Sequence, residues 1–338
     1  MNPLTSTQKK VFCAISAFPD DNDRQLAERL GMKRGTIASV RKVLEEQKLF
    51  TLSLVPDPRA LNLSFLGLKY GDYGKIKPIE YHRRMSLMTR DMKIAETLFS
   101  LSSPYRGLSV FYGKEFYPLQ EQLESWNSLF ESIDTTVVIR DYFAAPQAVR
   151  SYKFLETHPL LAQVLEVPAF SLPPLSSSLS SSRILRNKER QLLVAWLQES
   201  QASHLELSQK TGLSRSVVGT MKKRFLRQGI VQQLLLPSWV DLGIHLGVFL
   251  HIQVHPPQLS WVKELSLRPE IVFLLASSYH LFLLALYPDY DAYQRSALSL
   301  ELKKAKLVRE PREILFPLQD THFHLQGASV AERVLQKV

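Results

Sequence analysis

The sequence NDRQLAERLGMKRGTIASVRKVLEEQKLF (residues 22–50) returns as SHLELSQKTGLSRSVVGTMKKRFLRQGIV (residues 203–231), at an offset of 181 residues and without a gap. Apolar, small and basic positions coincide along the whole alignment: Gly31 falls on Gly212, Arg34 on Arg215 and Lys42 on Lys223. The chain therefore contains an internal duplication, and these two segments decide its fold.

Each copy carries the signals of two consecutive helices. A capping pair precedes the first helix, Asn22 with Gln25 in copy one and Ser203 with Glu206 in copy two. Such side chains accept hydrogen bonds from the free amides of a helix start. The aligned glycines then supply the left-handed residue that ends this helix. A second amphipathic helix follows after two or three residues, so each copy is predicted to be a helix-turn-helix.

The second helix of each copy has an apolar side and a polar side. Its apolar residues recur at the spacing of a face packed into a core. The opposite side carries small, hydrogen-bonding and cationic residues, which suit a helix that enters the major groove of DNA. We expect contacts to base edges from Arg34, Thr36, Ser39, Arg215, Ser216, Thr220 and Lys223, and contacts to phosphate from Lys33, Lys42, Lys222 and Arg227.

The two copies are not expected to bind equally. Copy two caps its second helix with Ser214 and has five cations and no acid between Ser214 and Gln228. Copy one starts this helix at Lys33, has Gly35 in its first turn and ends in two glutamates. We therefore expect the second copy to bind DNA more tightly.

The composition indicates a globular protein with a polyanionic partner. Of the 338 residues, 45% are hydrophobic and 22% are charged, and the net charge is +10. This length and composition predict two to four domains with cores of their own. The positive charge favours nucleic acid over an acidic membrane. The single cysteine, Cys13, lies in an apolar helical pattern and is expected to be a small buried hydrophobe in a reducing cytoplasm.

Two stretches bear on targeting and membranes. Lys9 and Lys10 interrupt any apolar run at the N-terminus, so no signal peptide is predicted. The most apolar stretch, IVFLLASSYHLFLLALY at residues 271–287, is broken by serines and a histidine and is short for a bilayer. We expect it to form two buried strands joined by a turn, in a cytoplasmic protein without membrane contacts.

The pattern continues on both sides of each helix-turn-helix. A helix over residues 6–18, capped by Ser6, and its counterpart from Asn187 precede the copies, and two-stranded wings at residues 49–55 and 230–236 follow them. The order β-α-β-β-α-β comes next in both, which is the ferredoxin-like arrangement with both helices on one side of a four-stranded antiparallel sheet.

The predicted fold class is α+β, with two winged helix-turn-helix domains and two ferredoxin-like βαββαβ domains in tandem. In copy one, the first helix of the βαββαβ domain is predicted at residues 81–91. The predicted boundaries are winged domains at 1–58 and 184–240, βαββαβ domains at 59–145 and 241–318, a linker, first helical and then rich in Pro and Ser, at 146–183, and a tail at 319–338.

This element order resembles the leucine-responsive regulatory protein (Lrp/AsnC-like, feast/famine) family over nearly the whole chain. The resemblance implies DNA binding by the winged domains, and dimerisation and often amino-acid binding by the βαββαβ (RAM-like) domains. Two family-length units in one chain imply an intramolecular pseudo-dimer, with further homodimerisation through these domains as an expectation. In place of the family's Gly-x-Tyr-Asp turn this chain has Ser102-Ser103-Pro104-Tyr105 and Ser277-Ser278-Tyr279-His280. We therefore assign no residues to a small-molecule effector.

The resulting prediction is a sequence-specific transcription regulator of archaeal or bacterial type that reads paired half-sites of double-stranded DNA. We predict that it is not an enzyme, and assign no catalytic residue, cofactor or metal. His322-Phe323-His324 would place two imidazoles on one side of a strand, but no Cys, Asp or Glu cluster at ligand spacing accompanies them.

Two alternatives stay open. Siroheme decarboxylases resemble the same architecture and work on a tetrapyrrole in the second domain. Tyr81-His82-Arg83-Arg84 looks like their Tyr- and Arg-rich segment, but it precedes the first helix of the domain where theirs would follow it. The other alternative is a protein-binding scaffold.

Overall fold

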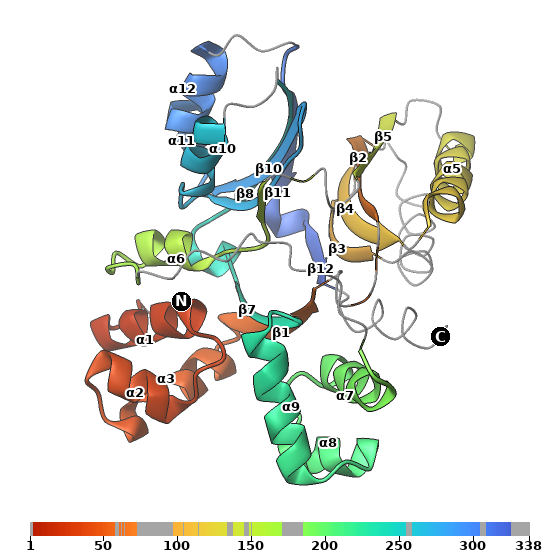
Figure 1. The fold of residues 1–338 in the computed structure, drawn as a ribbon. Coiled ribbons are helices and arrows are strands. Elements are labelled where there is room, and N and C mark those ends of the chain that lie inside the picture. The colour runs from red at the N-terminus through yellow and green to blue at the C-terminus, as the bar shows by residue number, and fades with distance from the viewer. Residues whose placement is uncertain are drawn as a thin grey trace. The chain divides into compact units, whose positions relative to one another are not determined.

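The chain forms two compact units, each built from separate parts of the sequence. Unit 1 comprises Met1–Ser53, Ala148–Ser178 and Gln233–Gln319, and unit 2 comprises Leu54–Gln147, Leu179–Gln232 and Asp320–Val338. The computed structural model describes residues 3–57, 61, 63, 65–72, 97–103, 105–113, 115–133, 138–144, 149, 151–170, 185–254, 259–304 and 309–325 (Figure 1). Each unit therefore combines the helix-turn-helix of one repeat with the sheet of the other.

The two helix-turn-helix heads form as the sequence predicts. Head 1 in unit 1 consists of α1 (Ser6–Ala17), α2 (Asp23–Leu30) and α3 (Arg34–Glu46), and head 2 in unit 2 of α7 (Asn187–Gln198), α8 (His204–Thr211) and α9 (Arg215–Arg227). Both predicted capping boxes are present, at Asn22 and Ser203. Gly31 and Gly212 have φ of +62° and +66°, which is the left-handed conformation that ends a helix without a Cβ clash.

One cap differs from the prediction. Thr5, not Ser6, caps α1, because its side chain accepts from the amide of Gln8 while the Gln8 side chain accepts from the Thr5 amide. The apolar faces of head 1 meet in a core that includes Val11, Ile15, Leu26, Ile37 and Leu44, all without solvent exposure. Cys13 is buried beside this core, and burial raises the pKa of its thiol to about 11.

The predicted two-stranded wings are wrong. Each head is followed by a single strand, β1 (Phe50–Pro56) or β7 (Val231–Pro237), and these two strands pair with each other. The Ser238 amide donates to the Leu49 carbonyl at 2.8 Å within unit 1, and the Asp57 amide donates to the Ile230 carbonyl at 2.8 Å within unit 2. Residues 50–56 and 231–237 are each one unbroken strand, and each takes its partner from the other repeat.

Each unit contains one five-stranded antiparallel sheet. The strand order is β11-β8-β10-β9-β6 in unit 1 and β12-β3-β4-β2-β5 in unit 2. Four strands of each follow the ferredoxin-like order predicted for the repeat, and the α+β fold class is confirmed. The elements are β8 (Leu246–Gln253), β9 (Ile271–Ala276), β10 (His280–Tyr287), β11 (Arg312–Pro317) and β6 (Ser151–Lys153) in unit 1, and β2 (Phe65–Asp72), β3 (Thr97–Ser102), β4 (Arg106–Gly113), β5 (Val138–Ala144) and β12 (His322–Leu325) in unit 2.

The fifth strand of each sheet comes from the segment that follows the other repeat. Residues 151–153 pair with β9, and residues 322–325 pair with β3. The first part of the linker at 146–183, predicted to be helical, is thus partly strand, and its helical part is α6 (His158–Val164), whose Leu161 joins the core of head 1. The exchange covers an edge of each sheet that would otherwise expose unpaired amides and carbonyls.

Helices cover one face of each sheet (Figure 1). In unit 1 they are α10 (Leu259–Ser266), α11 (Tyr290–Arg295) and α12 (Ala297–Lys304), and in unit 2 the described helix is α5 (Phe116–Ile133). The second helix of the predicted β-α-β-β-α-β order is broken in unit 1 at Ser296, whose extended backbone ends α11 and whose Oγ accepts from the Ser299 amide at 3.1 Å. The predicted helix at residues 81–91 lies outside the described residues, as does most of the Pro- and Ser-rich segment.

The apolar stretch at residues 271–287 forms β9 and β10, two antiparallel strands joined by a turn, as predicted. Their side chains are buried against α10, α11 and α12 on one face. None of the helices within the described ranges has the length and apolar content that a bilayer crossing requires.

Candidate functional site

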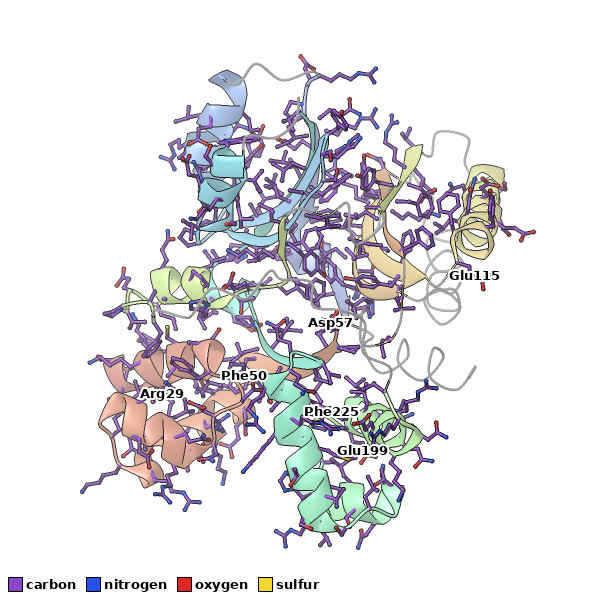
Figure 2. All side chains as sticks on the ribbon, in the orientation of Figure 1. Arg29, Phe50, Asp57, Glu115, Glu199 and Phe225 are labelled. Atoms are coloured by element: carbon purple, nitrogen blue, oxygen red, sulfur yellow. The ribbon has the colours of Figure 1, made fainter. Side chains whose placement is uncertain are left out.

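The residues predicted to contact DNA lie on two separate helices, α3 and α9. The five on head 1 are exposed, and so are all of those on head 2 except Lys222. The Lys222 ammonium lies 4.4 Å from the centre of the Trp196 ring, and burial lowers the pKa of Lys222. Phe225, labelled in Figure 2, is buried on the side of α9 opposite the exposed residues predicted to contact DNA. The packing of Phe225 therefore determines which side of the helix is exposed.

Head 2 has a hollow on its polar side, and only some of its lining residues are among the predicted DNA contacts. Its lining consists of Arg215, Ser216, Thr220 and Lys223, which were predicted, together with His204 and Gly219, which were missed. A Cβ at Gly219 would lie 3.2 Å from the His204 ring, so this glycine allows the imidazole to lie against α9. Burial and the neighbouring cations Lys222, Arg215 and Lys223 lower the pKa of His204. Gly219 lies in the interior of a helix, where glycine is unfavourable, and this position could have indicated that another side chain packs closely against α9.

A second candidate site lies on the helix-covered face of the unit 2 sheet. Residues directly opposite one another in antiparallel strands point to the same face. The register places one polar row across all five strands. It consists of Asp141 on β5, Lys69 on β2, Ser109 on β4, Ser100 on β3 and His324 on β12. Lys69 and Ser100 are 4% and 1% exposed.

This row faces α5. The Lys69 ammonium donates to the Leu123 carbonyl of α5 at 3.4 Å and lies 3.9 Å from an Asp141 carboxylate oxygen. The Asn127 side-chain amide of α5 donates to the other Asp141 oxygen at 2.7 Å. Desolvation raises the pKa of Asp141, and Lys69 and Asn127 oppose this shift by favouring the carboxylate. The result is a buried cation beside a carboxyl that holds its proton more strongly than usual.

The neighbouring positions on this face are small or polar. Gly71, Gly107 and Ser102 form the next row, which continues to His322 on β12. Ser102 is fully buried, and its hydroxyl has no hydrogen-bond partner within the described part of the chain. A buried hydroxyl without a partner costs roughly 1–3 kcal/mol. Such a group is a candidate for a contact with a ligand.

The equivalent row in unit 1 has apolar residues at its three central positions, between Glu313 on β11 and Lys153 on β6. The row that corresponds to Lys69, Ser109 and Ser100 there contains Leu250, Leu283 and Leu274, which are all buried. These leucines belong to the buried core of the unit 1 sheet. Among the described residues of unit 2, Phe111 and Leu123 are buried on the corresponding face, with Phe143 packed against them. The two units thus share the fold but differ in the centre of this row, which is apolar in unit 1 and polar in unit 2.

This polar face is not among the sequence predictions, although the sequence indicates a difference between the repeats. Lys69 aligns with Leu250 at the offset of 181 that the two heads share. The Tyr81–Arg84 segment lies outside the described residues. Within the described ranges, no three His, Cys, Asp or Glu side chains gather as a metal site would require.

Comparisons with solved structures place the whole chain in one known fold. A crystal structure of the siroheme decarboxylase NirDL in co-complex with an iron-uroporphyrin III analogue matches with a TM-score of 0.55 and 10% identity, and covers 98% of this chain and 97% of that one. A second structure of NirDL matches with a TM-score of 0.54 and 10% identity over 98% of both chains.

Regulators of the AsnC type match over less of the chain. The transcriptional regulator NMB0573 from Neisseria meningitidis, in complex with L-Met, is 20% identical, has a TM-score of 0.34 and covers 39% of this chain and 89% of its own. E. coli AsnC is 19% identical, has a TM-score of 0.31 and covers 43% of this chain and 94% of its own. No protein-family model matches the sequence, and no curated protein matches it either.

The prediction that the chain is not an enzyme is overturned by this comparison. The fold that extends over its whole length is that of a protein named as a decarboxylase. Of the predicted resemblance to Lrp/AsnC-like regulators only the coarse part is supported, because their structures match about 40% of the chain and NirDL matches all of it.

Proposed function

We propose that the chain is an enzyme that acts on a carboxylated tetrapyrrole, as a siroheme decarboxylase does, and that the polar face of the unit 2 sheet holds the reacting group. The observation that carries this proposal is the replacement of Leu250, Leu283 and Leu274 by Lys69, Ser109 and Ser100 in a fold whose whole-chain match is NirDL. Polar residues at these buried positions stabilise the fold less than leucines would. A binding function would explain why unit 2 has them.

The chemistry of decarboxylation fits this face. The bond between the carboxylate and its carbon breaks, CO₂ leaves, and the carbon that retains the electron pair takes up a proton. Lys69 is the cation that would hold the carboxylate, and the low polarity around it strengthens that contact. Asp141, whose pKa is raised, is suited to supply the proton.

The test is a visible-absorption titration of the full chain with iron uroporphyrin III. Lys69→Met should weaken binding about tenfold to a hundredfold, because a hydrogen bond to a charged group contributes about 1.5–3 kcal/mol. Lys153→Met is a matched control, since Lys153 is also buried but lies in unit 1, where its ammonium donates to the carbonyls of Ser266 and Arg268. No spectral change with the unaltered chain, or equal losses in both variants, would contradict the proposal.

A second candidate function is binding of duplex DNA by the heads. It is favoured by the exposed polar sides of α3 and α9, and above all by α9, which has five cations and no acid. If several of these cations neutralise phosphates, the affinity for a mixture of genomic fragments should fall by orders of magnitude between about 50 and 200 mM salt. A gel shift that is independent of salt, or absent at the lower concentration, would argue against it. Base-edge contacts and an effector remain predictions of the sequence.

A further inference from the structure

The hollow of head 2 is lined by polar groups that can all donate hydrogen bonds. It has a volume of about 550 Å³ and is open to solvent. Arg215 and Lys223 contribute permanent positive charge, and the other polar groups of the lining are the hydroxyls of Ser216 and Thr220 and the imidazole of His204. No carboxylate is among the lining residues. Such a lining suits an anion whose oxygens only accept hydrogen bonds.

We propose that this hollow binds a single phosphate group, either free in solution or part of a nucleic-acid backbone. The inference does not rest on the tetrapyrrole function. It also differs from the predicted contacts of these α9 side chains with base edges, because a hollow receives a group that protrudes toward the protein. Guanidinium, ammonium and hydroxyl groups gathered around one space match the accepting oxygens of phosphate.

A glycine of α9 determines where the imidazole of the hollow lies. A Cβ at Gly219 would lie 3.2 Å from Cε1 of His204 and 3.3 Å from its Nδ1. A side chain at position 219 would therefore displace the ring and fill part of the hollow. Glycine in a helix interior stabilises the helix less than alanine does. Binding of a ligand beside the imidazole would explain why α9 has a glycine here.

Head 1 differs from head 2 at this place in three ways that each oppose the binding of an anion. At the offset of 181, the positions of His204, Gly219 and Arg227 are taken by Asp23, Ala38 and Glu46. The Asp23 carboxylate pairs with Arg41 at 2.8 Å, and a Glu46 carboxylate oxygen lies 3.8 Å from the Lys42 ammonium. Head 1 thus has two carboxylates where head 2 has an imidazole and a guanidinium, so the phosphate site is expected in head 2 alone.

The cations of α9 act on the His204 ring, which makes this histidine a reporter of the hollow. Burial is the largest cause of its lowered pKa, followed by the charges of Lys222, Arg215 and Lys223. An anion in the hollow would offset these charges and favour the protonated ring, so bound phosphate should raise the pKa of His204. This readout requires neither DNA nor a tetrapyrrole.

The experiment titrates the full chain with inorganic phosphate at constant ionic strength, with chloride as the balancing anion. The ring protons of His204, identified by their absence in His204→Asp, are followed by NMR over a series of pH values. Phosphate should bind saturably and raise the pKa of His204. Arg215→Gln should weaken this binding roughly tenfold or more, because it removes a charged hydrogen-bond donor. Arg34→Gln, at the aligned position of head 1, is the matched control and should change the affinity by less than about twofold.

A second variant fills the hollow without risk to the fold. Gly219→Leu places a good helix former at a partly exposed position, so α9 should form as before while phosphate binding is lost. A titration with duplex DNA then distinguishes the two sources of phosphate. Weaker DNA binding by Arg215→Gln, with competition by phosphate, identifies the nucleic-acid backbone, and unaltered DNA binding identifies free phosphate.

Three outcomes would overturn the phosphate site. The first is that phosphate leaves the His204 signals as chloride does. The second is an equal loss of phosphate binding in Arg34→Gln and Arg215→Gln. The third is phosphate binding of unchanged strength in Gly219→Leu.

Discussion

At the scale of single residues, one buried ion pair distinguishes the core of head 2. The Glu189 side chain is 4% exposed, accepts from the Arg186 amide at 2.8 Å and pairs with Arg224 of α9. At the offset of 181, Gln8 and Val43 take these positions in head 1. Removal of one partner leaves the other charge half-buried, which is more costly than loss of an exposed pair.

Glu189→Ala should therefore destabilise head 2 by about 2–4 kcal/mol, since Arg224 would be left without this carboxylate. The control is Glu199→Ala, which removes an exposed pair with Lys210 and should cost less than about 1 kcal/mol. Hydrogen exchange of the α7 and α9 amides in the full chain measures both effects where they occur. Similar protection in the two variants would show that the buried pair contributes no more than the surface pair.

Residue patterns predicted the heads and the order of the strands, but they did not reveal the buried polar face of the unit 2 sheet, for a physical reason. In β2 the residues Leu66, Leu68 and Tyr70 alternate with Gly67, Lys69 and Gly71, and such a strand is typical of one buried and one solvated face. The structure instead covers the glycine and lysine face with α5. A lysine buried for binding and a lysine exposed to water give the same alternation, so periodicity alone could not separate them.

At the scale of elements, local signals predicted what local physics determines. The caps at Asn22 and Ser203 and the left-handed glycines at 31 and 212 act within a few residues, and each forms where it was expected. The pairing of β1 with β7, and the exchange of β6 and β12, join residues far apart in sequence. Hydrophobic pattern shows that a strand needs a partner but not which strand supplies it.

For the whole molecule, the sequence showed that the chain is duplicated but did not show which function the duplicated fold carries out. Element order predicts a fold and not a function, so it could not choose between a regulator and an enzyme, and the whole-chain match to NirDL at 10% identity likewise shows the fold. The choice depends on differences between the repeats, because a symmetric duplication needs no polar row in one sheet and an apolar core in the other. Differences between the repeats are informative for the two heads as well.

The two heads differ in charge, and this predicts unequal binding of DNA. Ser214 caps α9 through a hydrogen bond from the Val217 amide, whereas Lys33 gives α3 no side-chain cap. On α3 the Lys42 ammonium also lies 3.8 Å from a Glu46 carboxylate oxygen, which offsets its attraction to phosphate.

Arg215→Ala/Lys223→Ala should therefore reduce DNA affinity several-fold more than Arg34→Ala/Lys42→Ala, measured on the full chain at one salt concentration. All four side chains are exposed, so neither pair of substitutions should change the stability of the fold, which a thermal melt would verify. Equal losses, or a larger loss from head 1, would mean that charge and capping of the second helix do not determine which head dominates.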